Sequence, residues 1–487
     1  MQSYCRDSEI KMDNNLKRAT KRGIFWSAIQ RFSMQGIQFL TTLIMARFLT
    51  PEDYGIVGML GIFLALSSVF VDCGFTSALT RKQNLTQADK STVFFFNFFI
   101  GILAYIILFV SSPLIAHFYE IPTLSIALRT MSVVIIINSL SSVQATLMTI
   151  RLDFKTQAKI SVIAIFISGL VGIILAITGF TYWALIVQAI ISSILNTTLY
   201  WYYSDWRPSA IFSKKSFIEL FSFGSKLLAS SLIDTIYNNI YTVVIGKVYS
   251  ARTLGNYSRA ESYANFPSIS ITGIMQRVTY PVLCKIQNDE LLLARSYRKF
   301  LKLSAFIIFP MMTGLSALAH PFVVIIIGYQ WAFCASLLQI LCFALMWYPI
   351  HAINLNLLQV KGRTDLSLRL EIIKKIIGVT VLCISIPLGI IALCYSRIFT
   401  SLLCLFVNTY YTGKLIQVSF FQQLVDLAPT LIISISMWAV IWLSCYSITS
   451  LPLQILTGFL LGSIFYLIAS YFFNKEELMS IISLIHK

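Results

Sequence analysis

Apolar stretches of about 20 residues or more recur along the chain from Gly23 almost to its C-terminus. A helix of that length crosses the hydrocarbon core of a bilayer, which is about 30 Å thick. Charged residues make up only 12% of the chain, well below their share in an ordinary soluble domain. The sequence therefore predicts an all-α polytopic membrane protein with about 14 transmembrane helices. The expected spans are 23–46, 56–80, 91–113, 124–148, 157–178, 181–203, 220–246, 257–283, 300–327, 333–359, 369–390, 391–413, 427–448 and 452–473.

The net charge of +17 follows a pattern along the chain. Lys and Arg crowd the N-terminal tail and every second loop after it, whereas the intervening loops hold only Arg47, Lys247 and Arg252. Because cytoplasmic loops of membrane proteins carry the excess of Lys and Arg, this alternation predicts that both termini face the cytoplasm. It also accounts for the positive charge without nucleic acid, so no nucleic-acid partner is expected.

A short corner between two spans occurs twice. The stretch "ARFLTPEDYG" (46–55) aligns without gaps with "GKVYSARTLG" (246–255), pairing Thr50 with Ser250 and Gly55 with Gly255. Thr50 can cap a helix with its hydroxyl, and Pro51 suits a first helical turn, so the second helix is expected to begin there. Both corners join the first and second helix of a six-helix set. We therefore expect two lobes in a parallel pseudo-two-fold repeat, an architecture of transporters.

This repeat gives an expected domain organisation. The parts are a basic cytoplasmic tail (1–22), an N-lobe with helices 1–6 (23–203), a cytoplasmic linker (204–219), a C-lobe with helices 7–12 (220–413), two appended helices (427–473) and a cytoplasmic C-terminal tail (474–487).

Polar side chains form stripes on the first and seventh predicted helices. At 100° per residue, each stripe fits within an arc of about 120° or less. Such groups either hydrogen-bond to neighbouring helices as packing contacts or line a polar cavity. The stripes comprise Ser27, Arg31, Gln35, Gln38 and Thr42 on the first helix, and Lys226, Ser230, Asp234, Tyr237, Asn238 and Tyr241 on the seventh.

Several charges lie well inside predicted spans, where each costs on the order of 3 kcal/mol. Arg31, Lys226 and Arg277 are expected to line a cavity between the lobes, joined by Lys374 and Lys375 unless these two extend to the interface. A cationic cavity suits an anionic substrate such as a phosphate or pyrophosphate headgroup. The polar residues expected to line the same cavity are Gln35, Gln38, Tyr237, Asn238 and Tyr241.

Acids are scarcer in these spans and have two possible roles. Asp72 lies at a depth similar to that of Arg31, so the two could form a salt bridge. Asp234, near the middle of its helix, could take up a proton or coordinate a cation and so couple transport to an ion gradient. Near the outer helix ends, pairing at the rim is the default interpretation for Arg129, Arg259, Glu261 and Arg397.

Several functional classes are disfavoured by what the sequence lacks. It has no GxxxxGK[ST], HExxH or GxSxG motif, which would indicate ATP binding, a zinc site or a nucleophilic serine. Its nine cysteines include no CxxC pair, and no connection exceeds roughly 20 residues. No catalytic residue, metal or cofactor is expected.

Four segments, in order along the chain, resemble the polysaccharide-exporter family of bacterial lipid-linked oligosaccharide flippases. They are "FWSAIQRFSMQGIQFLTTLIMARFLTPEDYGIVGM", "DCGFTSALTRK", "GKVYSARTLGNYSRAESYANFP" and "YPVLCKIQ". The family belongs to the multidrug, oligosaccharidyl-lipid and polysaccharide transporter superfamily. The resemblance implies an inner-membrane protein that moves undecaprenyl-pyrophosphate-linked repeat units to the periplasmic leaflet for surface polysaccharide assembly. Its partners would be this substrate, membrane lipids, and a polysaccharide polymerase and assembly proteins.

Two alternatives stay open. A multidrug or cation antiporter of the same fold would be expected to favour acids in its cavity, in contrast to the embedded Lys and Arg here. An integral-membrane glycan polymerase or ligase would be expected to carry a sizeable external loop, and the outer loops here are short.

Overall fold

The computed structural model describes residues 26, 30 and 33–485, apart from the side chains of 364, 484 and 485. Every regular element in this part of the chain is a helix, so the all-α prediction is confirmed. Ten of these helices are long and apolar enough to cross a membrane, or eleven if the bent pair Thr123–Ser139 and Ser142–Ile150 forms one span. The protein is therefore a multi-pass membrane protein, although its helices do not establish the predicted count of 14.

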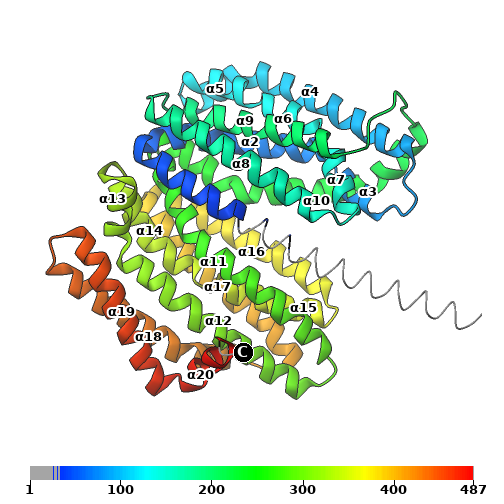
Figure 1. Ribbon diagram of the computed structural model, residues 1–487. Coiled ribbons are helices and arrows are strands. Elements are labelled where there is room, and N and C mark those ends of the chain that lie inside the picture. The colour runs from blue at the N-terminus through cyan, green and yellow to red at the C-terminus, as the bar shows by residue number, and fades with distance from the viewer. Residues whose placement is uncertain (1–25, 27–29, 31–32, 486–487) are drawn as a thin grey trace, which may run out of the picture. The chain divides into compact units, whose positions relative to one another are not determined.

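The described helices fall into two compact units that divide after Leu254. The helices of unit 1 are α2 (Pro51–Asp72), α3 (Phe75–Arg81), α4 (Gln87–Tyr119), α5 (Thr123–Met131), α6 (Val133–Ser139), α7 (Ser142–Ile150), α8 (Phe154–Ile177), α9 (Trp183–Tyr203) and α10 (Lys214–Val248) (Figure 1). Residues 33–48, from the first predicted span, are also helical. The boundary places α10 in unit 1, whereas the sequence repeat assigns the same segment to the C-lobe (220–413). The two lobes of the repeat therefore stay a prediction.

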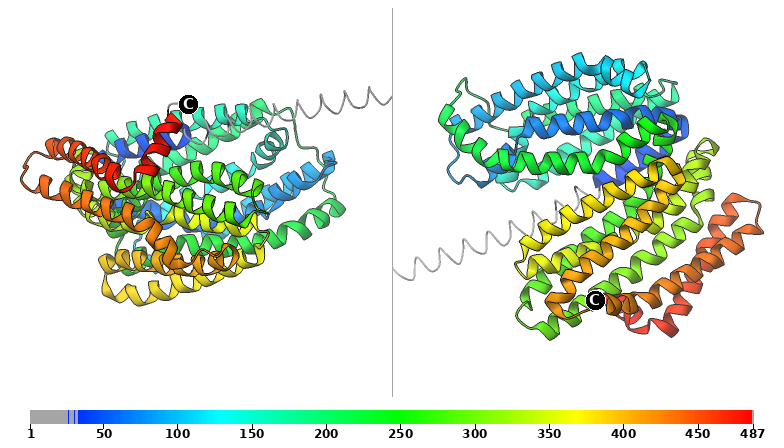
Figure 2. Two further views of the ribbon diagram at one scale, coloured as in Figure 1. Left: turned by 90° about the horizontal axis from the view of Figure 1, so that it is seen from below. Right: turned by 180° about the vertical axis from the view of Figure 1, so that it is seen from behind.

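Unit 2 contains α11, which begins just before the boundary, and all the helices that follow it in the chain. These are α11 (Ala251–Lys285), α12 (Glu290–Ala317), α13 (Ala319–Ile327), η1 (Tyr329–Trp331), α14 (Ala332–Leu345), α15 (Tyr348–Val360), α16 (Thr364–Ser385), η2 (Ile386–Leu388), α17 (Ile390–Ile416), α18 (Phe420–Tyr446), α19 (Leu451–Phe473) and α20 (Lys475–Ile485). Helices α16 and α17 lie side by side (Figure 2). Helix α11 covers the predicted span 257–283, and α16 covers the predicted span 369–390 as far as Ser385. Neither helix is apolar enough to count as a span by composition.

The first corner is built as its sequence predicts. Thr50 Oγ1 accepts a hydrogen bond from Asp53 N at 3.3 Å, and Asp53 Oδ2 accepts one from Thr50 N at 2.8 Å. This reciprocal capping box, followed by Pro51, fixes the start of α2. Ser250 plays the corresponding role in the second corner, because its Oγ accepts from Thr253 N at 3.0 Å. The pairing of Thr50 with Ser250 is thus a shared capping function.

Within unit 1 the two corners pack directly against each other. A Cβ atom added to Gly55 would lie 1.8 Å from the carbonyl oxygen of Ala251, so only glycine permits this approach. A second close approach occurs where the predicted span 56–80 breaks between α2 and α3. Gly74 has a positive φ of 72° there, and a Cβ on it would lie 2.6 Å from the carbonyl oxygen of Gly224 in α10. Glycines thus permit the close backbone contacts of α2 with the second corner and of the α2–α3 break with α10.

The C-terminal helices of unit 2 pack on α12. Helices α18 and α19 form an antiparallel pair that ends in α20 (Figure 1). Tyr466 on α19 donates its hydroxyl to the carbonyl oxygen of Phe306 on α12 at 2.8 Å. Residues 475–485, predicted only as part of a tail, form the short helix α20.

Replacing Gly55 with alanine should destabilise the protein by about 1–3 kcal/mol, because the new methyl group would collide with the Ala251 carbonyl. Thermal unfolding of the purified protein in detergent measures this effect. Gly58→Ala is the matched control, since its Cβ would meet Leu254 at an ordinary 3.5 Å. Equal melting temperatures for the two variants would contradict the proposed close packing of the corners.

Candidate functional site

The polar stripe on α10 is the main candidate site in unit 1. Lys226 and Asn238 are exposed, and neither makes a hydrogen bond or ion pair with the described residues. Asp234 is also exposed, while Tyr237 and Tyr241 are half-buried. Lys226 and Asn238 therefore make no polar contact with another helix in the described part of the chain, and their role at a substrate site stays a prediction.

The remaining polar residues predicted in unit 1 have mixed positions. Gln35 is half-buried and Gln38 is exposed on the helical segment that precedes the first corner. Asp72, half-buried at the end of α2, accepts hydrogen bonds from the backbone N–H and the hydroxyl of Thr76. Arg31 lies outside the described residues, so its salt bridge with Asp72 stays a prediction.

An ion pair holds the second corner to α4 in unit 1. Lys247, which the repeat pairs with Arg47, lies 2.8 Å from Glu120 Oε1. The hydrogen bond and positive charge of Lys247 lower the pKa of Glu120 below its usual value. Both side chains lie at helix ends, so this pair contributes to the packing of the corner rather than to the α10 stripe.

The predicted cations of unit 2 differ in their surroundings. Arg277 is exposed on α11 and has no ion-pair partner among the described residues. Lys374 on α16 instead lies 2.5 Å from Glu371 Oε1, one turn earlier on the same helix. Lys375 is half-buried beside it. The prediction that Lys374 lines the cavity as a free cation is therefore wrong, because Glu371 neutralises it, whereas Arg277 keeps an exposed positive charge.

A buried polar network in unit 2 was missed from the sequence. Asn354 Oδ1, on α15, lies 2.8 Å from the hydroxyl of Tyr297 on α12 and accepts from Thr412 on α17 at 2.9 Å. His351, one turn earlier on α15, has its Nε2 atom 3.1 Å from Ser401 Oγ and its Nδ1 atom 3.1 Å from Asn408 Nδ2. The network joins three helices of unit 2. The available signal was the presence of amides and a histidine within apolar stretches.

Two further ion pairs in unit 2 join helices that are far apart in the sequence. Arg397 lies 2.9 Å from Glu261, which confirms rim pairing for these two residues. Arg298 forms a two-pronged contact with Asp426, whose side chain is only 4% exposed.

In the described part of the chain, no group of three or more His, Cys, Asp or Glu side chains is placed to hold a metal ion.

The arrangement of the helices is similar to that of solved membrane proteins. The fold is similar to that of "Lipid II flippase MurJ, inward closed conformation", with a TM-score of 0.74 and 18% sequence identity over 93% of this chain and 100% of that chain. The protein thus belongs, by its fold, to the all-helical membrane proteins of this architecture.

The particular family follows from the sequence match. Residues 44–336 match the family described as polysaccharide biosynthesis protein, and the chain belongs to this family. One relative is the teichuronic acid biosynthesis protein TuaB of Bacillus subtilis (strain 168), 26% identical over 71% of this chain and 72% of the relative. Another is the succinoglycan biosynthesis transport protein ExoT of Rhizobium meliloti (strain 1021), 27% identical over 67% of this chain and 66% of the relative. The resemblance to the polysaccharide-exporter family is therefore confirmed.

Replacing Asn354 with leucine should lower the free energy of unfolding by about 1–3 kcal/mol, because the Tyr297 and Thr412 hydroxyls would lose their buried acceptor. Thermal unfolding in detergent is the measurement. Asn196→Leu is the control, since among the described residues the amide of Asn196 donates to a backbone carbonyl of its own helix, that of Ser192, and to no side chain. If Asn354→Leu were no less stable than the control, the network would have no structural role.

Proposed function

We propose that this protein moves oligosaccharide repeat units, linked to undecaprenyl pyrophosphate, from the cytoplasmic to the periplasmic leaflet of a bacterial inner membrane. The observation that carries the proposal is the match to the polysaccharide biosynthesis family over residues 44–336, in a chain with a transporter fold. The name of the relative ExoT, a transport protein of polysaccharide biosynthesis, supports transport over synthesis. The protein would supply such units for surface polysaccharide assembly and hand them to a polymerase.

The proposed substrate contact is electrostatic. Arg31, Lys226 and Arg277 would bind the pyrophosphate, because hydrogen bonds between cationic side chains and phosphate oxygens are strong in a low-dielectric site. The exposed positions of Lys226 and Arg277 support this role. Lys375 and the polar residues of the α10 stripe would contact the sugars or line the path. Lys374 is not included in the proposed site because Glu371 neutralises it.

The proposed mechanism is alternating access, in which the predicted lobes rock around a cavity that opens to one leaflet at a time. Both termini would lie in the cytoplasm, as the alternation of basic loops indicates. No covalent step is needed, so the protein would act as a transporter without a catalytic residue or cofactor.

The combined replacement of Arg31, Lys226 and Arg277 by alanine should reduce translocation by at least about tenfold, since each lost charged contact is worth on the order of 1.5–3 kcal/mol. Lipid-linked oligosaccharide should then accumulate in the inner leaflet, as measured by its accessibility to an external glycosidase in inverted membrane vesicles. The control replaces Lys214, Lys215 and Arg369, three exposed cations outside the proposed site. Normal surface polysaccharide in the first triple variant, at equal protein level, would refute the cationic site.

Asp234→Asn should abolish any dependence of translocation on a proton or sodium gradient if this carboxylate couples transport to ions. The measurement is translocation in proteoliposomes with and without an imposed gradient. Wild-type-like gradient dependence in the variant would exclude Asp234 as the coupling group.

The same proteoliposomes separate the proposed function from its two alternatives. A glycan polymerase would lengthen the oligosaccharide, whereas a flippase would only relocate it. A multidrug or cation antiporter would move cationic drugs and leave the lipid-linked substrate in place.

A further inference from the structure

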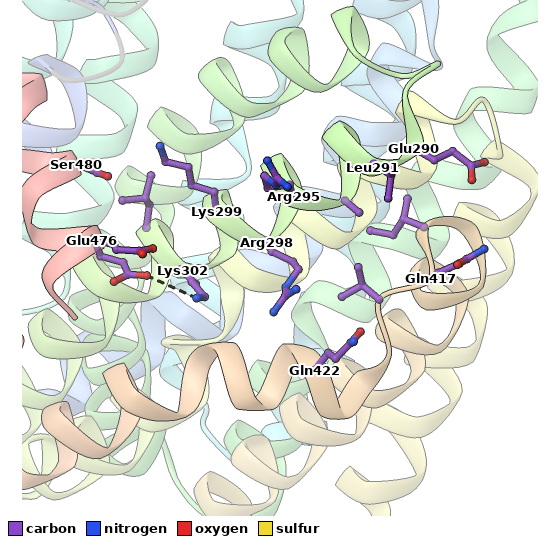
Figure 3. A pocket seen from close by; sticks show the side chains of 15 residues that line it. Glu290, Leu291, Arg295, Arg298, Lys299, Lys302, Gln417, Gln422, Glu476 and Ser480 are labelled. Carbon is purple, nitrogen blue, oxygen red and sulfur yellow. Dashed lines mark ion pairs between the residues drawn. The ribbon is translucent and has the colours of Figure 1, made fainter. Parts of the chain in front are cut away.

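A pocket lined by basic residues lies in unit 2 at the start of α12 (Figure 3). Its volume is about 930 Å³. Helix α12 contributes its cations, and α18 and α20 contribute Gln422 and Ser480. We call this cavity, defined by Arg295, Arg298, Lys299 and Lys302, the basic pocket.

Two of the four cations are already neutralised. Arg298 contacts both carboxylate oxygens of the buried Asp426, at 2.6 and 2.8 Å. Lys302 lies 3.6 Å from Asp426 and 3.9 Å from Glu477 on α20. These pairs anchor α12 to α18 and α20, so Arg298 and Lys302 are structural residues of the pocket wall.

The other two cations have no such partner. Arg295 and Lys299 are one helical turn apart on α12, and both are exposed. Neither forms an ion pair with any residue that the structure describes. Two rim carboxylates remain: Glu290 lies at the far end of the pocket beyond Leu291, and Glu476 lies beside Lys302 (Figure 3). The stretch between Arg295 and Lys299 therefore carries uncompensated positive charge.

The surroundings of the basic pocket are those of a membrane interface. Helix α19 ends in three exposed aromatic residues, Tyr471, Phe472 and Phe473, of the kind that gathers where a span leaves the bilayer. Helix α20 follows directly and exposes the apolar side chains of Met479 and Ile482. On the pocket rim, Leu291 is 86% exposed. A soluble anion would gain nothing from these apolar groups, whereas a lipid would contact them with its glycerol and acyl carbons.

We propose that the basic pocket binds the phosphate headgroup of an anionic phospholipid, with Arg295 and Lys299 as its main contacts. Their paired charges would meet the phosphate, and the exposed apolar residues of α20 would lie against the acyl chains. The alternation of basic loops predicts that this end of α12 lies on the cytoplasmic side, where anionic lipid attracts Lys and Arg. The proposal depends on the membrane location of the protein and not on the identity of its transported substrate.

Thermal unfolding of the full-length protein in mild detergent tests the proposal. Titrated phosphatidylglycerol should raise the melting temperature of the wild type, because a ligand that binds only the folded state stabilises it. Phosphatidylcholine should have little effect. The Arg295→Ala, Lys299→Ala double variant should need roughly 30-fold more phosphatidylglycerol for the same shift in melting temperature. The reason is that each lost cation should weaken lipid binding about fivefold.

The control is Lys214→Ala, Lys215→Ala, which removes the same charge from an exposed helix start of unit 1 and should leave the titration unchanged. Glu476→Gln should strengthen the response, because it removes a rim carboxylate. A titration of the Arg295, Lys299 variant that matches the wild type would overturn the proposal. Equal protection by inorganic phosphate would also overturn it, since the bound group would then be a soluble anion.

Discussion

Inside a bilayer no water is available to pair with a backbone N–H or C=O, so each unpaired group would cost several kcal/mol. Helices satisfy these groups within one segment, which is why all regular structure in the described residues is helical. The same constraint favours side chains that pair with the free backbone N–H groups at helix starts. The capping box of Thr50 and Asp53 recurs at Thr86 and Asp89, where α4 begins. Where the corners meet, glycine replaces a side chain so that backbones can pack closely.

The same low-dielectric environment divides the charged residues into two groups. In unit 2, Asp426, Glu261 and Glu371 each hold a cation in a direct ion pair, so those charges stabilise the fold. Lys226 on α10 and Arg277 on α11 have no such partner among the described residues, although each lies within a long helix. Charge kept exposed in a membrane helix indicates contact with water or a ligand. For this reason Lys226 and Arg277 remain the strongest members of the proposed substrate site.

Local sequence signals were sufficient for the features that depend on neighbours in the chain. The cap at Thr50 and the all-helical class follow from residue type and position, whereas rim pairing was expected for Arg397 and Glu261 without naming either as the partner of the other. The sequence could not reveal features that depend on packing in space. The break at Gly74 coincides with a close backbone contact with α10, and the His351 network requires α15 and α17 to be adjacent. Helical periodicity shows which residues share a face, but not what that face contacts.

The central claim is that Lys226 recognises the negative charge of a lipid headgroup. Equilibrium binding of undecaprenyl pyrophosphate and of uncharged undecaprenol to the purified protein tests this most directly. The wild type should bind the pyrophosphate more tightly, and Lys226→Ala should lose most of that preference, because the hydrocarbon chain is identical in both ligands. An equal preference in wild type and variant, or none in either, would contradict the account.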